Sequence, residues 1–207
     1  MDHAHAYPVT YDVAYPDRPL NRLTSFFRLF TALPVVLLLT AVAGVAVVSE
    51  SGGTGTVVAT GCGVLFLPPL LMLVFRGRYP RWWYDFNVEL LRFQNRVGVY
   101  VALMDDRYPS ADEHQSVRLE VPEPVGLSRW KPLVKWALAI PHYVVLAVLS
   151  AAAVVAMVIA WFAILFTGRF PRAIFDYLVG VGRWTNRVTA YAFLLVTDDY
   201  PPFRLRA

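Results

Sequence analysis

The chain contains three long apolar runs that hold no Asp, Glu, Lys or Arg, at about residues 29–48, 56–75 and 136–166. A helix needs about 20 apolar residues to cross roughly 30 Å of hydrocarbon, so each of the first two runs is long enough for one crossing. The third run is too long for one perpendicular helix and short for two. We expect it to form a tight helical hairpin that turns near Ser150, with one long tilted helix as the alternative.

Basic residues flank these runs, and the link between the first two, "SESGGTG", has none. By the positive-inside rule, both termini and the segment between the second and third runs are expected on the cytoplasmic side. A composition of 57% hydrophobic and 16% charged residues also favours the bilayer over water as the solvent. The chain is therefore predicted to be a multi-pass protein of the cell (cytoplasmic) membrane.

The chain also repeats itself. Adding 91 to each residue number aligns "GRYPRWWYDFNVELLRFQNRV" from Gly77 with "GRFPRAIFDYLVGVGRWTNRV" from Gly168, and both copies continue to an acidic pair. Upstream, "LNRLTSFFRLFTALP" parallels "LSRWKPLVKWALAIP", which places Arg28 over Lys135. Such self-similarity indicates two copies of one structural unit. We expect the first unit at residues 1–112 and the second at residues 113–207.

Each unit is predicted to contain a short strand, a basic juxtamembrane helix, a transmembrane hairpin and an amphipathic interfacial helix. The amphipathic helices are expected at about residues 81–104 and 172–197, after prolines that a first helical turn tolerates. The alternating segments "VTYDV" and "VRLEV" read as strands, which should pair with each other or with the tail "FRLRA". The predicted fold class is an all-α integral membrane protein with a small β element.

Three stretches resemble a known family: "ALAIPHYVVL", "FTGRFP" and "TDDYPPF". They are similar to the bacterial membrane-protein family catalogued as domain of unknown function 4389. The resemblance covers most of the second unit and, more weakly, the first, where "PHYVV" becomes "PVVLL". It implies an integral membrane protein and implies no reaction.

A polar seam runs along each amphipathic helix at helical spacing. Its members in the two units are Asp85, Glu89, Arg92, Asn95 and Arg96, and Asp176, Arg183, Asn186 and Arg187. One interpretation is that each arginine neutralises a nearby acid, as Glu89 and Arg92 are spaced to do, or contacts lipid phosphate. The alternative is that the two seams meet and form a polar path or a site for an anionic headgroup. Retention of the Arg, Asn and Arg positions in both units favours a shared structural role.

Other polar residues are candidates on weaker grounds. Interfacial basic side chains are Arg78, Arg81, Arg169 and Arg172. His142 lies inside the third apolar run, where it has a function, bonds a carbonyl freed near Pro141, or takes an interfacial position. The acidic pairs at Asp105 and Asp198 are interpreted as helix ends that need no extra partner. One cysteine and the absence of a catalytic motif give no metal site, no cofactor and no catalytic residue.

The leading hypothesis is a non-enzymatic membrane scaffold or accessory subunit that binds anionic lipid, a larger membrane complex, or both. The alternative is a small transporter or lipid-translocating protein that uses the seam, and a membrane enzyme ranks third. The expected partners are membrane lipids, with a membrane-protein partner or homo-oligomer left open. Nucleic acid is not expected, because the arginines flank apolar runs instead of forming a dense patch.

Overall fold

The computed structural model describes residues 7–16, 18–43, 46–47, 57–58, 61–76, 79–110, 115–124, 127–128 and 130–206. Within these ranges the protein is mostly helical, with one two-stranded sheet of β1 and β4, called the sheet below, and a shorter pair of β2 and β3. The helices are α1 (Arg22–Phe26), α2 (Arg28–Ala43), α3 (Gly61–Arg76), α4 (Arg81–Val101), α5 (Lys131–Leu138), α6 (Ile140–Thr167) and α7 (Arg172–Ala192). The strands are β1 (Thr10–Val13), β2 (Ala46–Val47), β3 (Val57–Val58) and β4 (Val117–Glu120).

The third apolar run forms one long helix, and the hairpin expected near Ser150 is wrong. Helices α5 and α6 together form a helical segment of 37 residues, Lys131–Thr167, and Ser150 lies well inside α6. The residues around Ser150 are alanine, valine and leucine without glycine or proline, so nothing there ends a helix. Helix α6 ends only at Gly168, whose left-handed φ of 71° suits glycine.

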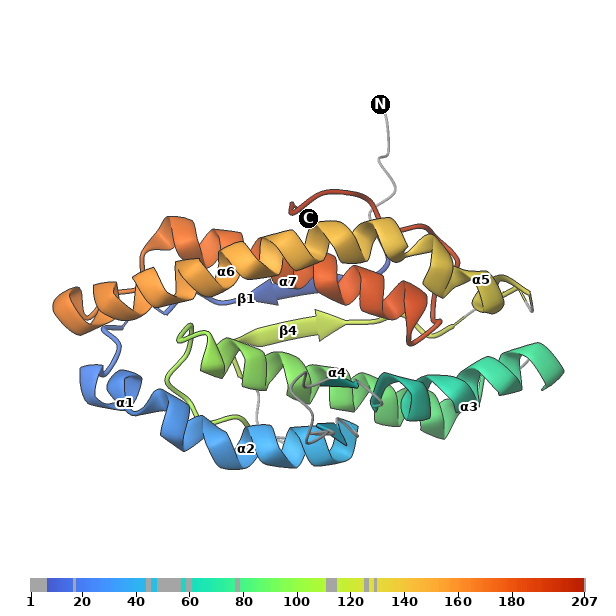
Figure 1. The fold of residues 1–207 in the computed structure, drawn as a ribbon, viewed down its shortest axis with the longest axis horizontal. Helices are drawn as coiled ribbons and strands as arrows, with labels where there is room; N and C mark the ends of the chain where they lie inside the picture. The colour runs from blue at the N-terminus through green and yellow to red at the C-terminus, as the bar shows by residue number, and fades with distance from the viewer. Residues whose placement is uncertain are drawn as a thin grey trace, which may run out of the picture.

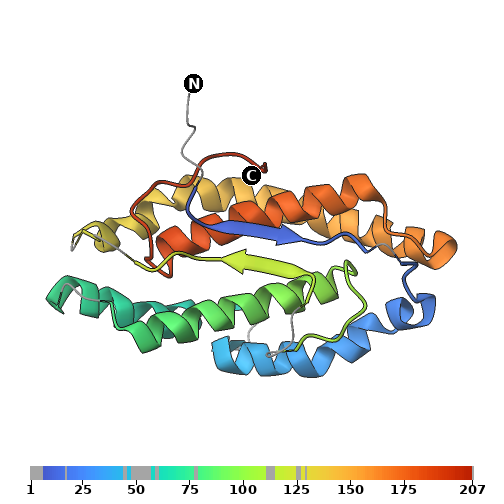
Figure 2. The ribbon, with the colours of Figure 1, turned by 180° about the vertical axis from the view of Figure 1, so that it is seen from behind.

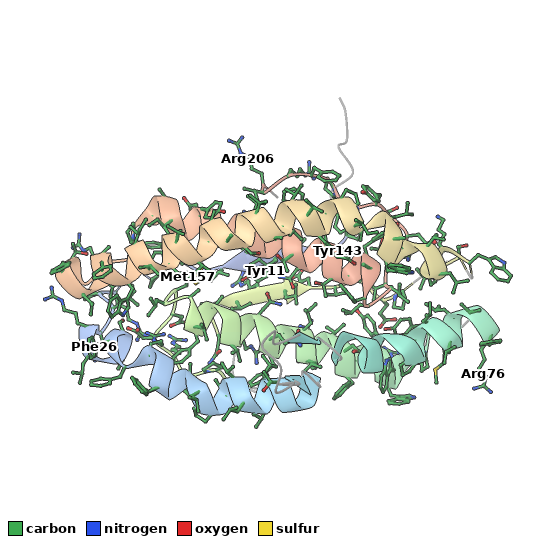
Figure 3. All side chains as sticks on the ribbon, in the orientation of Figure 1. Tyr11, Phe26, Arg76, Tyr143, Met157 and Arg206 are labelled. Atoms are coloured by element: carbon green, nitrogen blue, oxygen red, sulfur yellow. The ribbon has the colours of Figure 1, made fainter. Side chains whose placement is uncertain are left out.

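The first two apolar runs do not form the expected antiparallel hairpin either. Figure 3 places Phe26, at the start of this segment, and Arg76, at its end, at opposite ends of the protein. Helices α2 and α3 therefore run in the same direction along the long axis, and the short β2–β3 pair lies between them in the chain. Each has 16 residues, about 24 Å at 1.5 Å per residue, which is less than the hydrocarbon thickness.

Strands β1 and β4 pair antiparallel, as predicted, with Tyr11 opposite Leu119. Alternate side chains point to opposite faces. Tyr11, Val13 and Leu119 are buried, whereas the outer face exposes Thr10, Asp12, Arg118 and Glu120. The sheet thus has one apolar face for packing and one charged face for water.

The buried face of the sheet packs on the amphipathic helices, β1 on α7 and β4 on α4. Helix α6 packs on α7, and α2 packs on α4. Figure 1 looks onto the side of α2, α3, α5 and α6, which we call the apolar layer, and β1 is partly hidden behind α6 and α7. Figure 2 looks onto the opposite side, where both strands are in full view. The amphipathic helices lie between a charged sheet face and the apolar layer.

Helices α4 and α7 have the same length, 21 residues, and both of their bounds differ by 91. Each follows a proline, Pro80 or Pro171, whose fixed φ suits the residue before a helix. A leucine with positive φ follows each helix, Leu103 at 65° and Leu195 at 58°. Both leucines are buried, so apolar packing holds this unfavourable backbone conformation and turns the chain towards the acidic pair.

Gly182 on α7 is required by its close approach to the sheet. A Cβ at this position would lie 2.7 Å from Cε1 of the buried Tyr11 side chain, whereas a Cβ at Gly98 on α4 meets nothing within 4 Å. We expect Gly182→Ala to lower the free energy of unfolding by about 1–3 kcal/mol through overpacking. Gly98→Ala, the matched control, should raise it by about 0.5–1 kcal/mol because alanine loses less backbone entropy. Denaturation in mild detergent measures both, and equal effects would contradict this role of Gly182.

Candidate functional site

The two polar seams meet at one pair of residues, Asn95 on α4 and Asn186 on α7. Nδ2 of Asn95 donates to Oδ1 of Asn186 at 2.8 Å, and Nδ2 of Asn186 donates back to Oδ1 of Asn95 at 2.7 Å. Each amide also donates to the carbonyl four residues earlier in its own helix, Leu91 or Gly182. The pair therefore fixes the two helices against each other through reciprocal hydrogen bonds.

The seam arginines bind backbone carbonyls. Nε of Arg183 donates to the Tyr11 carbonyl at 2.9 Å, and Nε of Arg92 donates to the Leu119 carbonyl at 3.2 Å. Tyr11 and Leu119 are cross-strand partners, so the two arginines hold the sheet at one place from both helices. Bonds to charged donors are stronger than neutral ones, and these support a sheet of only two strands.

The other two seam arginines bind segments outside the regular elements. Arg96 donates to the Ser110 carbonyl at 2.6 Å. Arg187, which is 4% exposed, donates to the carbonyls of Arg204 and Arg206 in the C-terminal tail. The tail thus covers α7, and it does not join the sheet.

The seam acids do not assemble with these arginines as a buried path requires. Glu89 pairs with Arg92, as its spacing predicted. Asp85 and Asp176 are exposed, and no ion pair joins either of them to an arginine in the described part of the chain. Arg183 pairs instead with Asp12 at 2.7 Å, an exposed acid on β1. Asp176 and Arg183, both members of the second seam, are therefore not paired with each other.

The interfacial basic residues lie on the surface. Arg81 pairs with Glu123 at 3.1 Å, and the guanidinium of Arg172 lies 4.6 Å above the ring of Tyr15. Arg169 is exposed immediately after the end of α6. Arg78 lies outside the described residues. Arg81, Arg169 and Arg172 are therefore open to solvent or headgroups.

The strongest electrostatic sites are two buried cations that the sequence argument did not select. Arg28 at the start of α2 is 2% exposed and contacts Asp106, and its Nη1 donates to the Tyr100 carbonyl at 3.1 Å. Lys135 in α5 is fully buried, and its Nζ lies 2.6 Å from Oδ1 of Asp198. Both cations thus bind the acidic pair that follows an amphipathic helix, so the interpretation that these acids need no partner is wrong.

The two cation sites have the same construction. Arg28 lies 4.3 Å above the ring of Tyr100, and Lys135 lies 5.3 Å above the ring of Tyr191, which is 91 residues later. The second carboxylate oxygen of each acid accepts a backbone N–H from the start of the basic segment. The donor is Asn21 for Asp106, at 2.9 Å, and Ser128 for Asp198, at 3.0 Å. Each site ties an apolar helix to the end of an amphipathic one.

These contacts favour the ionised form of Asp198. Burial alone would raise the pKa of its carboxyl group, but the ion pair with Lys135, the backbone N–H of Ser128 and the charge of Lys131 hold the pKa below its ordinary value. The carboxylate is therefore the form that the fold stabilises, and it neutralises a cation that has no access to water.

His142 accepts a side-chain hydrogen bond. The indole Nε1 of Trp184 donates to Nδ1 of His142 at 3.0 Å, and the ring of Phe203 stacks on the imidazole at 3.9 Å. The histidine is fully buried, and its Nε2 has no hydrogen-bond partner in the described part of the chain. The expected bond to a carbonyl freed by Pro141 is absent, because the imidazole turns towards α7 and the C-terminal tail.

Sequence reasoning missed Arg28, Lys135, Asp106 and Asp198 although the signal was present. Each of the two similar stretches of sequence has one cation at the same place before its apolar run and an acidic pair after its amphipathic helix. In each case a cation and an acid recur at positions far apart in the sequence. If the apolar and amphipathic helices are assumed to be antiparallel, these charges come together, and the pattern predicts a buried ion pair. Among the residues described, no three His, Cys, Asp or Glu side chains are grouped as a metal site requires.

The model of a family described as a domain of unknown function, DUF4389, matches residues 129–204. The resemblance predicted from the sequence is confirmed over these residues. The DUF4389 match covers α5, α6 and α7 and includes Lys135, His142 and Asp198. Comparisons with curated proteins and with solved structures give no match.

The Lys135–Asp198 pair leads to a stability prediction. Asp198→Asn leaves a buried ammonium without its counter-charge, and we expect the free energy of unfolding in mild detergent to fall by about 3–5 kcal/mol. Asp199→Asn changes the exposed neighbouring acid and should stay within about 0.5 kcal/mol. Adding Lys135→Met to Asp198→Asn should recover most of the loss. Equal losses for the two aspartate variants would show that Lys135 does not depend on Asp198.

Proposed function

We propose that this protein is a non-enzymatic scaffold or accessory subunit embedded in the cell membrane through its apolar layer. The observation that carries the proposal is the surface of the Lys131–Thr167 segment. Only 17% of its most apolar 18 residues is buried inside the protein, so it is not the core helix of a water-soluble domain. Val144, Val148 and Val155 are each at least 60% exposed. Lipid or a membrane-protein partner would cover this surface.

Helices α1 and α2 also expose large apolar side chains. Leu23, Phe30 and Leu37 are 69%, 74% and 60% exposed. Exposed basic residues stand at the ends of the apolar helices, among them Arg22, Arg76, Lys131 and Arg169. Cations in these positions suit contact with anionic headgroups, each contributing on the order of 1 kcal/mol near a charged membrane surface.

The orientation that fits this geometry places the long axis along the membrane surface. Figure 1 shows β1 and β4 at the same level along the long axis as the middle of α6. If α6 crossed the bilayer, the charged sheet face with Asp12, Arg118 and Glu120 would lie at the depth of the hydrocarbon. A charged side chain at that depth costs about 2.5–3.5 kcal/mol even on the lower scales. Immersing the apolar layer from one side leaves the sheet in water and avoids this cost.

We further propose that the chain is a tandem duplication of one unit, at residues 1–112 and 113–207. The support is the offset of 91 between α4 and α7, the reciprocal Asn95–Asn186 bonds and the equivalent construction of the two cation sites. Reciprocal contacts between corresponding residues are what a twofold relation between two units produces.

The scaffold proposal is better supported than transport. A transporter that used the seam would need its acids and arginines buried and facing each other. Asp85 and Asp176 are exposed, and the arginines hold strand and tail carbonyls. The seam side chains are therefore occupied in maintaining the fold.

Membrane association is tested by placing charge on the exposed face of α6. We expect Val148→Asp with Val155→Asp to leave the fold intact and to release the protein from membranes, because each carboxylate costs about 3 kcal/mol in hydrocarbon. The fraction remaining in the membrane pellet after an alkaline carbonate wash measures this, and gel filtration in detergent checks the fold. Thr10→Asp on the sheet is the control and should change neither. Unchanged retention of the double variant would overturn the proposal.

Orientation is tested at the two ends of the long helix. In a Cys62→Ala background, Lys131→Cys and Arg169→Cys place a single thiol beyond either end of the apolar stretch. If the helix lies along one membrane surface, an impermeant thiol reagent should label both from the same side of sealed vesicles. Labelling from opposite sides would show that the helix crosses the bilayer.

A further inference from the structure

A groove of about 460 Å³ lies between α4 and α7. Leu90, Gln94 and Gly98 line it from one helix, and Leu178, Thr185 and Phe193 line it from the other. Its volume falls within the range of about 300–1,000 Å³ that is usual for small-ligand sites. Neither the seam arginines nor the buried cation sites described above line this groove.

The chemistry of the groove suits an uncharged apolar chain. No Asp, Glu, Lys or Arg side chain is among the described residues that line it. The two asparagine amides at its base, Asn95 and Asn186, already donate to each other and to helix carbonyls. A charged group in this groove would lose its hydration without gaining a partner, so an anionic headgroup or a peptide with charged side chains is disfavoured.

The groove opens towards the apolar layer. Its base includes Tyr11 of β1 and Asn186, which are 8% and 3% exposed. Gly98 and Thr185, which also line the groove, are exposed, so we infer that its mouth lies on the side of α4 and α7 that the sheet does not cover. Helices α6 and α2 pack on α7 and α4, and they form the side of the protein seen in Figure 1. The mouth therefore belongs to the same surface that the proposed function places in lipid.

We propose that this groove holds one acyl chain of a membrane phospholipid. The inference rests on the proposed membrane immersion of the apolar layer and adds a specific lipid site to it. Continuity with that layer gives a chain a route from the bilayer that never crosses water. The uncharged lining matches a hydrocarbon chain, and the charged headgroup stays outside the groove, at the level of the basic helix ends.

Gly98 allows the groove to be blocked without crowding the fold. A Cβ at this position meets nothing within 4 Å, so an added side chain enters open space. Gly98→Phe should fill part of the groove, whereas Gly98→Ala adds only a methyl group. Both replacements also remove a glycine from the interior of a helix, which favours folding.

The test uses vesicles of phosphatidylethanolamine and phosphatidylglycerol that contain a phospholipid with a photoactivatable diazirine in one acyl chain. After irradiation, adducts are mapped by peptide mass spectrometry. We expect adducts on residues 90–102 and 178–193 in the unmodified protein and in Gly98→Ala. In Gly98→Phe these adducts should fall by about tenfold, as expected when a side chain takes the ligand's space. Adducts on the outer face of α6, around Val148, should be equal in all three.

The inference is overturned if the unmodified protein forms no groove adducts, or if Gly98→Phe forms as many as the unmodified protein. In either case, adducts on α6 would still support the proposed membrane immersion. The loss of adducts on α6 in all three proteins would overturn the proposed function itself, and the acyl-chain site with it.

Discussion

Two buried cations are the constraint on which the rest of this structure depends. Arg28 begins α2 and Lys135 lies in α5 just before the third apolar run, yet both are almost completely buried. A cation in such a place is tolerated only when an acid and additional hydrogen bonds accompany it. Asp106 and Asp198 supply the charge, and backbone carbonyls complete each site. Because each acid follows an amphipathic helix, this requirement fixes the amphipathic helix against the apolar helix of the same unit.

The remaining polar groups bring the two proposed units together. A sheet of two strands is marginally stable alone. Here Arg92 and Arg183 bind its carbonyls at the Tyr11–Leu119 pair, and Asn95 and Asn186 bond each other. Arg92 in the first unit holds the strand of the second, and Arg183 in the second holds the strand of the first. The strands are thus exchanged between the units. Each unit depends on an arginine of the other unit to hold its strand.

Local patterns in the sequence predicted the elements better than their arrangement. Alternation found both strands, and proline followed by 3.6-residue periodicity found α4 and α7. The 91-residue offset predicted that Asn95 and Asn186 are equivalent, and the structure places them in contact. Length and hydropathy failed for the apolar runs, because a helix of 28 residues and a chain reversal satisfy the same composition. Only the absence of glycine and proline around Ser150 distinguished them, and the direction of α3 relative to α2 had no local signal.

The failure has a physical cause that also bears on function. The residue numbers of the two similar basic segments differ by 107 and those of the amphipathic helices by 91, so the proposed first unit is longer than the second between these two elements. The second unit forms one continuous helix, α6, where the first has α2, the β2–β3 pair and α3. In both units the apolar helices run once along the long axis of the protein, and the amphipathic helix runs back in the opposite direction. An insertion is tolerated at this place because the buried cation lies before it and the acid lies after the amphipathic helix. The sequence and length of the apolar layer can therefore change without disturbing the polar sites. Those sites keep the two amphipathic helices, and the groove between them, in position.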